Sequence, residues 1–196
     1  MPSNLRIIKT AIFISERGSN MKSLIKYSKK KNSKIEITKV FSNNKTAKGI
    51  ETATKLNVPE IFYYSKKSFE EKIKKNLYDI ELICLAGFMQ ILSPSFVNKW
   101  KGRLINIHPS YLPHFKGLKA QQKEIVTKAS FSGCTVHYVN KKIDSGNIIK
   151  KKKIKILNKD DVESLTKKIL IEEHKLYPKA LNVVVKKLLL NKKIND

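Results

Sequence analysis

The chain has 196 residues, and its 41% hydrophobic and 29% charged residues are typical of a globular protein rather than a disordered one. Its formal net charge of +25 would suit nucleic acid, but the basic residues are spread along the whole chain and only three of them are arginine. Because arginine is the residue that bidentate phosphate and base recognition favours, we expect no nucleic-acid partner. No apolar run approaches the length of a membrane span and no signal peptide is visible, so we expect a cytoplasmic chain without membrane contact.

The two cysteines, Cys84 and Cys134, lie in apolar, strand-like segments. In that setting a thiol is more often a small buried hydrophobe than half of a disulfide or a metal ligand, so we expect reduced cysteines and no bound metal. The chain is long enough for one continuous core, and no linker or internal repeat interrupts it. We therefore expect a single domain that spans residues 1–196.

Apolar, β-rich runs alternate with helix-like segments through the first half of the chain. The expected strands cover residues 7–14, 35–41, 61–64, 80–86 and 104–108. The expected helices between them cover residues 21–27, 46–56, 69–77 and 92–100. Because the connections are short and the run at 80–86 is almost continuously apolar, this pattern predicts a parallel sheet with helices on both faces.

The second half of the chain departs from this alternation. A helix at 119–128 precedes a strand at 133–139, a turn at 140–147 and a strand at 148–156, a pattern typical of an antiparallel hairpin. Asp160 or Asp161 then caps a long helix. Its apolar stripe includes Val162, Leu165, Ile169, Leu176 and Ala180. The predicted fold class is α/β: a doubly wound, mostly parallel sheet with a C-terminal antiparallel hairpin strand and a long C-terminal helix.

The strand at 104–108 ends at Pro109, which forbids its continuation because proline lacks an N–H and fixes its own φ. Asn106 and His108 are two residues apart, so they point to the same face near the carboxyl end of the strand, where open α/β sheets bind ligands. A carboxamide beside an imidazole can stabilise a developing oxyanion and exchange a proton near neutral pH. An ordinary strand end with a surface histidine is the alternative interpretation.

Two further features indicate binding. Gly18, Ser19 and Asn20 stand where a strand leads into a helix, so free N–H groups and the positive end of the helix dipole would meet an anion there. Ser19 and Asn20 can also cap that helix, and a plain strand-to-helix loop is the alternative. Glu173 falls within the apolar stripe of the C-terminal helix and should face inward with it. Its alternative is a carboxylate at the rim of the stripe, paired with a lysine.

Polar groups from several segments are expected to converge on one edge of the sheet. These segments are residues 18–20, residues 87–92, Asn106 with His108, Thr135 with His137, and Asp144. No serine or cysteine stands in a nucleophile elbow, no G-x-G-x-x-G is present, and no spacing indicates a metal site. Asn, His and Asp remain, a set suited to acyl transfer between two bound substrates without a covalent enzyme intermediate.

The segments ISERGSN, AGFMQILSP, INIHPSYLP, GCTVHYV, the Asp144-Ser-Gly turn and EEHKLYP resemble, in order and spacing, those of the phosphoribosylglycinamide formyltransferases. The match runs from about residue 7 to residue 185, and IHPSYLP and AGFM are specific to the folate-dependent formyltransferases. The resemblance implies transfer of formyl from 10-formyltetrahydrofolate to the amine of glycinamide ribonucleotide in purine synthesis. It further implies a monomer or homodimer that binds only these small molecules.

The resemblance also implies roles for individual residues. The catalytic set would be Asn106, His108 and Asp144. The groups on the ribonucleotide would be Gly18, Ser19, Asn20, Gly87 and Glu173. Those on the folate cosubstrate would be Lys66, Met89, Gln90, Ile91, Leu92, Asn106, Asn140, Lys141, Lys142, Ile143 and Asp144. Protonated His108 and Asn106 would stabilise the oxyanion, and Asp144 would orient the imidazole and favour its charged form.

The chain departs from the family pattern at several positions that bear on substrate affinity. Glu16 stands where the phosphate loop usually has glycine, and Gln90 replaces a frequent arginine. Lys116 replaces a proline, Lys119 and Gln121 replace histidines, and Lys66 is the nearest candidate for a folate-side arginine.

Other functions share parts of this pattern. Methionyl-tRNA formyltransferase has the same catalytic core, but it carries a further C-terminal domain for which 196 residues leave no room, and its first loop lacks the Gly-Ser-Asn signature. Formyltetrahydrofolate hydrolase has an additional N-terminal regulatory domain. A non-catalytic basic binding module is the alternative from another class.

Overall fold

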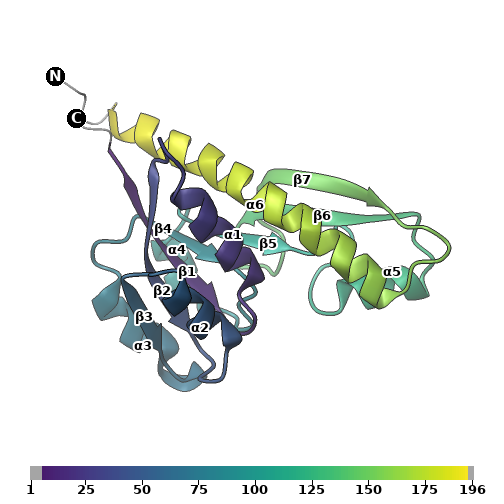
Figure 1. Cartoon of the computed structure of the whole chain (residues 1–196), viewed down its shortest axis with the longest axis horizontal. Helices are drawn as coiled ribbons and strands as arrows, with labels where there is room; N and C mark the ends of the chain where they lie inside the picture. The colour runs from purple at the N-terminus through teal and green to yellow at the C-terminus, as the bar shows by residue number, and fades with distance from the viewer. Residues whose placement is uncertain (1–5, 194–196) are drawn as a thin grey trace.

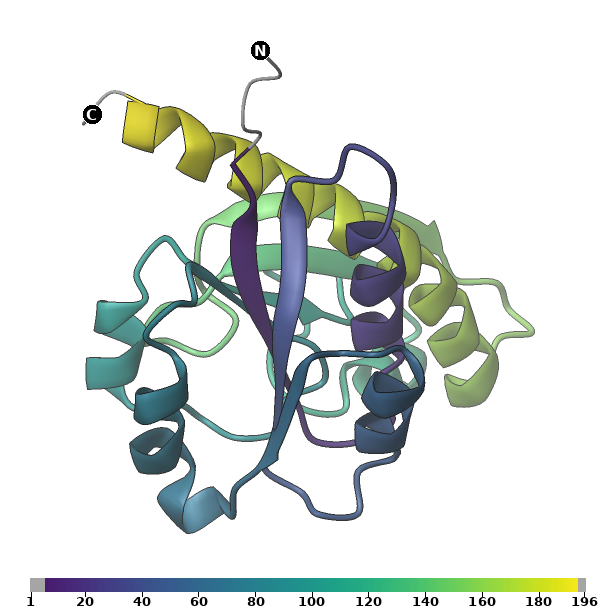
Figure 2. The ribbon, with the colours of Figure 1, turned by 60° about the vertical axis from the view of Figure 1, so that its left-hand side comes forward.

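The computed structural model describes residues 6–193, which form a seven-stranded sheet with helices on both faces (Figures 1 and 2). The strands are β1 (Ile8–Ile14), β2 (Ile35–Ser42), β3 (Glu60–Tyr63), β4 (Leu82–Leu85), β5 (Leu104–His108), β6 (Phe131–Tyr138) and β7 (Ile148–Lys155). Their order in the sheet is β3-β2-β1-β4-β5-β6-β7. Strands β1 to β5 are parallel, β6 is antiparallel to β5, and β7 is antiparallel to β6. The predicted fold class is confirmed.

Helices cover the two faces of the sheet unequally. They are α1 (Ser19–Ser28), α2 (Lys48–Lys55), η1 (Lys66–Ser68), α3 (Phe69–Ile73), η2 (Lys74–Asn76), α4 (Pro94–Lys99), α5 (Ala120–Val126) and α6 (Val162–Lys193). Figure 2 shows α1, α2 and α6 on one side of β1 and β2, with α3 and α4 on the other. None of the described helices is both long and apolar enough to cross a membrane.

The alternation of side chains along β1 explains this arrangement. Ile12 and Ile14 pack in the cluster that contains α1 and α6, whereas Ala11 and Phe13 pack in the cluster that contains α3 and α4. All four side chains are fully buried. A strand covered on both faces needs apolar residues on both, which accounts for the run of four apolar residues at the end of β1 and for the nearly continuous apolar run at 80–86.

Several helix ends differ in detail from the prediction. Helix α1 begins at Ser19, and Gly18 precedes it with φ 67° and no side-chain cap, so Ser19 and Asn20 lie inside the first turn. Asp161 caps α6, because its Oδ1 accepts the N–H of Ser164 at 2.7 Å. Val162 begins α6 and is 41% exposed, so this member of the predicted apolar stripe is not part of the core.

The strand register sets the level at which the polar residues emerge. Phe13 of β1 pairs with Leu85 of β4, and Leu85 pairs with Asn106 of β5. Asn106 therefore stands level with the end of β4, its parallel neighbour, and close to the level at which β1 ends, and β5 continues to His108. In the antiparallel direction, Asn106 pairs with His137 of β6.

Candidate active site

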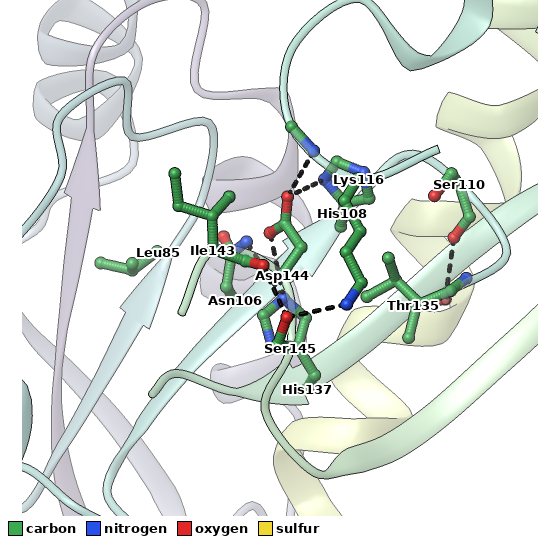
Figure 3. A network of polar contacts seen from close by, with 12 residues as sticks. Leu85, Asn106, His108, Ser110, Lys116, Thr135, His137, Ile143, Asp144 and Ser145 are labelled. Atoms are coloured by element: carbon green, nitrogen blue, oxygen red, sulfur yellow. Dashed lines mark hydrogen bonds and ion pairs between the residues drawn. The ribbon is translucent and has the colours of Figure 1, made fainter. Parts of the chain in front are cut away.

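Asp144 lies at the centre of a group of polar side chains from β5, β6 and the β6–β7 turn (Figure 3). Its Oδ2 is 3.2 Å from Nδ1 of His108, and its Oδ1 is 3.5 Å from Nε2 of His137. The Nδ2 of Asn106 is 3.4 Å from the same nitrogen of His137. The backbone N–H of Gly117 donates to Oδ2 of Asp144 at 2.9 Å. The structure thus brings the three predicted catalytic residues together and adds His137.

The route by which Asp144 reaches this group differs from the prediction of a single sheet edge. Because β6 runs antiparallel to β5, its last residue, Tyr138, pairs with Ile105 near the start of β5. The turn that follows must fold back along the face that bears Asn106. Asp144 adopts φ 46° in this turn. A Cβ on Gly146 would lie 1.6 Å from the carbonyl oxygen of Tyr138, so only glycine fits there.

Both ring nitrogens of His108 face acceptors. Nε2 is 3.0 Å from the carbonyl oxygen of Phe115, and Nδ1 faces Asp144. Burial lowers the pKa of His108, while the Phe115 carbonyl and the charge of Asp144 partly offset that decrease. Since the neutral ring carries one N–H, only the doubly protonated ring can donate to both neighbours. Protonation of His108 therefore strengthens its hydrogen bonds to Asp144 and to the carbonyl of Phe115.

Asp144 is held in its anionic form. Burial by itself would raise the pKa of this carboxyl, but hydrogen bonding from His137, the charge of His108 and the N–H of Gly117 together lower the pKa below its usual value. A carboxylate at this point can orient an imidazole or a bound water. The arrangement is therefore suited to stabilising positive charge on a neighbouring imidazole.

His137 belongs to the group, although the sequence suggested only that it was a polar residue near the sheet edge. Its Nδ1 is 2.9 Å from the carbonyl oxygen of Tyr138, which leaves Nε2 directed at Asp144. Thr135, in contrast, has no free hydroxyl. Its Oγ1 donates to the carbonyl of Ser110 at 2.8 Å and accepts the N–H of Leu112 at 3.1 Å, so it anchors the segment after β5.

The predicted ribonucleotide residues form a second group. The Nδ2 of Asn20 donates to Oε2 of Glu173 at 2.8 Å, and Glu173 is only 6% exposed. Burial raises the pKa of Glu173 to about 7. The inward orientation is thus confirmed, and within the described chain no lysine pairs with this carboxylate. The Oδ1 of Asn20 is buried without a hydrogen-bond partner, so an acceptor next to the start of α1 is unsatisfied.

Glycines shape the neighbouring backbone. Gly18 has φ 67°, and a Cβ there would lie 2.9 Å from Cε of Met21 and 3.0 Å from Cα of Gly49. Gly87 has φ 72°, and its carbonyl accepts the N–H of Ser15 at 3.1 Å. The loop before α1 is therefore packed closely against α2 and joined to the loop after β4.

The predicted folate residues are mostly exposed. Met89, Ile91 and Ile143 are 51%, 77% and 57% exposed, and Figure 3 places Ile143 beside Asp144 and Leu85. The exposed polar members of the set are Lys66, Asn140, Lys141 and Lys142. Leu92 is 7% exposed and packs in the core, so its side chain is not available for a ligand. The side chain of Gln90 is also occupied, as described below.

The residues that depart from the family pattern have definite surroundings. Glu16 is exposed and, within residues 6–193, makes no ion pair with Arg17. Nζ of Lys116 donates to Oγ of Ser145 at 2.8 Å, next to Asp144. Lys119 precedes α5 with φ 59°, and Gln121 donates to the carbonyl of Pro109 at 3.4 Å. These last contacts hold the segment after β5 rather than forming the Asp144 group.

The profile of the formyl transferase family matches residues 8–181, and the chain belongs to this family. Phosphoribosylglycinamide formyltransferase from Bacillus subtilis (strain 168) is 35% identical over 180 residues, which make up 88% of this chain and 92% of that protein. The crystal structure of phosphoribosylglycinamide formyltransferase from Anaplasma phagocytophilum matches with a TM-score of 0.87 at 39% identity, covering 92% of this chain and 87% of that one. The resemblance inferred from the motifs is confirmed.

Larger relatives contain the same unit. The chain is 43% identical over 185 residues to the trifunctional purine biosynthetic protein adenosine-3 of Chironomus tentans and 37% identical over 183 residues to that of Homo sapiens. In each case 90% of this chain is matched, but it spans only 14% and 18% of the lengths of those two proteins.

Proposed function

We propose that this chain, as a single catalytic domain over residues 1–196, transfers the formyl group of 10-formyltetrahydrofolate to the amine of glycinamide ribonucleotide. The observation that carries the proposal is the position of Asp144, which contacts His108 and His137 beside Asn106 at the end of β5. Family membership gives the reaction class, and this group supplies the chemistry that such a reaction requires. No covalent intermediate with the enzyme is needed.

The reaction forms one bond and breaks another. The amine of the ribonucleotide attacks the formyl carbon, and the carbonyl oxygen gains negative charge in the tetrahedral intermediate. Asn106 donates a hydrogen bond to that oxygen. A proton leaves the amine and reaches the folate nitrogen as the bond from that nitrogen to carbon breaks. His108 carries this proton directly or through a water that Asp144 orients. Since both reactants are bound in line, positioning supplies a large part of the rate.

Direct proton transfer from Nε2 of His108 would require a movement of the segment after β5. Nε2 of His108 is 3.0 Å from the carbonyl of Phe115, and the histidine is 6% exposed. For Nε2 to meet a substrate, the Phe115 carbonyl has to leave it. Phe115 has φ 53°, an unusual conformation for a residue other than glycine, so the contact rests on a strained backbone position.

The two substrates approach from different strand ends. We assign the phosphate of the ribonucleotide to the start of α1 at Gly18, Ser19 and Asn20, where free N–H groups point outward. Glu173, which Asn20 holds in place, would accept a hydrogen bond from one of its hydroxyl groups. We assign the folate to residues 89–92, with the 140–144 turn on its other side.

Location and assembly form part of the proposal. Cys84 and Cys134 are free and buried, which suits a reducing compartment such as the cytoplasm. The protein would act as a monomer or homodimer on small molecules, without nucleic acid.

One assay tests the proposal against its alternatives. The purified chain would be incubated with 10-formyltetrahydrofolate and, in separate reactions, glycinamide ribonucleotide, initiator methionyl-tRNA or water alone. We expect rapid formylation of the ribonucleotide only. Preferential formylation of the tRNA, or release of formate at a comparable rate without an acceptor, would refute it.

A further inference from the structure

Side chains at the carboxyl ends of adjacent strands are joined by a continuous series of hydrogen bonds. Oγ of Ser15, directly after β1, donates to Oδ1 of Asn43 at 2.7 Å. Nδ2 of Asn43, directly after β2, donates to Oε1 of Gln90 at 3.1 Å. Nε2 of Gln90 donates to the carbonyl of Lys66 at 3.2 Å. This series, here called the Ser15–Asn43–Gln90 chain, runs across the ends of β4, β1 and β2 to the residues after β3.

The chain is closed onto the backbone of the loop after β4. The N–H of Met89 donates to Oγ of Ser15 at 2.7 Å, and the N–H of Ser15 donates to the carbonyl of Gly87 at 3.1 Å. Ser15 and Asn43 are each 4% exposed, so neither can meet a ligand through much of its surface. The two sides of this loop are anchored in the core, because the ring of Phe88 lies 5.0 Å from that of Phe69 and Leu92 is buried. Between these anchors Met89 and Ile91 are exposed, so the bond to Ser15 holds the part of the loop that faces solvent.

Gln90 uses both ends of its side-chain amide within the protein. Its oxygen accepts from Asn43, and its nitrogen donates to Lys66. The expectation that this side chain contacts the folate therefore needs revision. The ammonium of Lys66 is exposed and has no ion pair in the part of the chain that the structure describes.

Resting on the proposed function, we propose that Gln90 is a positioning residue. Through Asn43 and Ser15 it fixes residues 87–92 relative to the ribonucleotide loop that begins at Glu16, and through the Lys66 carbonyl it fixes η1 next to the same loop. The folate would then meet a preformed backbone. Preformed loops improve binding because less conformational freedom is lost when the ligand arrives.

Substitution of the buried partner Asn43 distinguishes a positioning role of Gln90 from direct contact between Gln90 and the folate. We expect Gln90→Ala and Asn43→Ala each to raise the KM for 10-formyltetrahydrofolate about tenfold, the scale of one lost hydrogen bond to a binding loop. The KM for glycinamide ribonucleotide should stay within about twofold and kcat within about threefold. The double variant should resemble either single variant, because residues acting as a unit are non-additive.

A matched control removes a similar amide bond elsewhere. Nδ2 of Asn76 donates to the hydroxyl of Tyr64 at 2.8 Å. Asn76→Ala should therefore lower Tm about as much as Gln90→Ala and Asn43→Ala do, without changing the KM for the folate. An increase in KM for Gln90→Ala but not for Asn43→Ala would overturn the proposal in favour of direct contact. Loss of kcat with unchanged KM in both variants would overturn it as well.

Amide hydrogen exchange separates this proposal from the proposed function. Exchange at Met89 should accelerate in Gln90→Ala and Asn43→Ala, while exchange in the core of β1, at Ile12, stays unchanged. If the wild type formylates nothing, the proposed function fails, and exchange at Met89 still decides whether Gln90 positions the loop. Wild-type exchange at Met89 in both variants would refute the positioning role.

Discussion

Replacement of Glu173 by glutamine tests the second group of residues through two separate quantities. Glu173 is 6% exposed, and its one hydrogen-bond donor within the described chain is Nδ2 of Asn20 at 2.8 Å. Burial raises the pKa of this carboxyl from its ordinary value of 4.5 to about 7. Glutamine keeps an oxygen that can accept from Asn20, yet it carries no charge. The variant should therefore behave like a permanently neutral Glu173.

The magnitude follows from the two pKa values. Below pH 4.5 the carboxyl is protonated in both the folded and the unfolded chain. Between pH 4.5 and 7 the folded chain retains a proton that the unfolded chain releases, so the free energy of unfolding falls as pH rises. Above pH 7 the loss is complete. A shift from 4.5 to about 7 at 1.36 kcal/mol per unit corresponds to about 3 kcal/mol.

Chemical unfolding at pH 5, 6, 7 and 8 measures this effect. Glu173→Gln should gain stability relative to the wild type as pH rises, by about 2–3 kcal/mol between pH 5 and 8. Glu172→Gln is the matched control, because this neighbour is half-buried and pairs with Lys175 at 2.7 Å. Parallel curves for Glu173→Gln and the wild type across the range would refute the reasoning.

Binding supplies the second quantity. A hydroxyl group donates more strongly to a carboxylate than to an amide, so Glu173→Gln should weaken glycinamide ribonucleotide binding about tenfold at pH 8. Folate binding should not change. A variant that gains stability and binds the ribonucleotide as the wild type does would leave Glu173 as a buried structural acid. Titration calorimetry with each substrate separates these outcomes.

Three further predictions concern single residues. Asp144→Asn should retain Tm and both substrate affinities but lower kcat about 10²-fold or more in steady-state assays, because the charge that favours a neighbouring imidazolium is lost. A wild-type kcat in this variant would mean that Asp144 serves only the turn. Gly146→Ala should lower stability by about 2–3 kcal/mol, because its Cβ would lie 1.6 Å from the carbonyl oxygen of Tyr138; an unchanged Tm would mean that the turn relaxes. Glu124 is fully buried with Oε1 unpartnered, and burial raises its pKa to about 7. In the same unfolding assay, Glu124→Gln should therefore gain stability relative to the wild type as pH rises from 5 to 8. A difference in the free energy of unfolding that stays constant with pH would contradict this.

Most of the fold could be predicted because the apolar runs of the strands and the helical spacing of apolar residues in the long C-terminal helix are both clear in this sequence. The strand at 80–86 is buried on both faces, and the stripe of α6 places Leu165, Ile169 and Ala180 in the core as expected. Helix ends were less accurate because tertiary contacts decide them. Asn20 does not cap α1, since its side chain is bound to Glu173, a residue far away in the sequence.

The candidate site could be predicted only where a residue's role is local. Asn106 and His108 follow from the strand end and its alternation. His137 contacts Asn106 because of the antiparallel register between β5 and β6, which no local pattern specifies. Burial of Glu124 depends on the packing of α5 against β6 and α6, and nothing in its neighbouring residues indicates this. The inward orientation of Gln90 likewise depends on partners from two other strand ends.

The reversal of strand direction at β6 explains how a turn residue can be held firmly enough for chemistry. The β6–β7 turn leaves β6 near the start of β5, where the N–H of Val139 donates to the carbonyl of Leu104 at 2.9 Å. It is closed again by the N–H of Tyr138, which donates to the carbonyl of Asn147 at 2.9 Å. Between these two hydrogen bonds the backbone of the turn crosses the face of β5, and Gly146 allows it to pass close to the carbonyl of Tyr138. The carboxylate of Asp144 is thus carried by a closed loop on a paired hairpin, which limits its movement relative to the imidazoles.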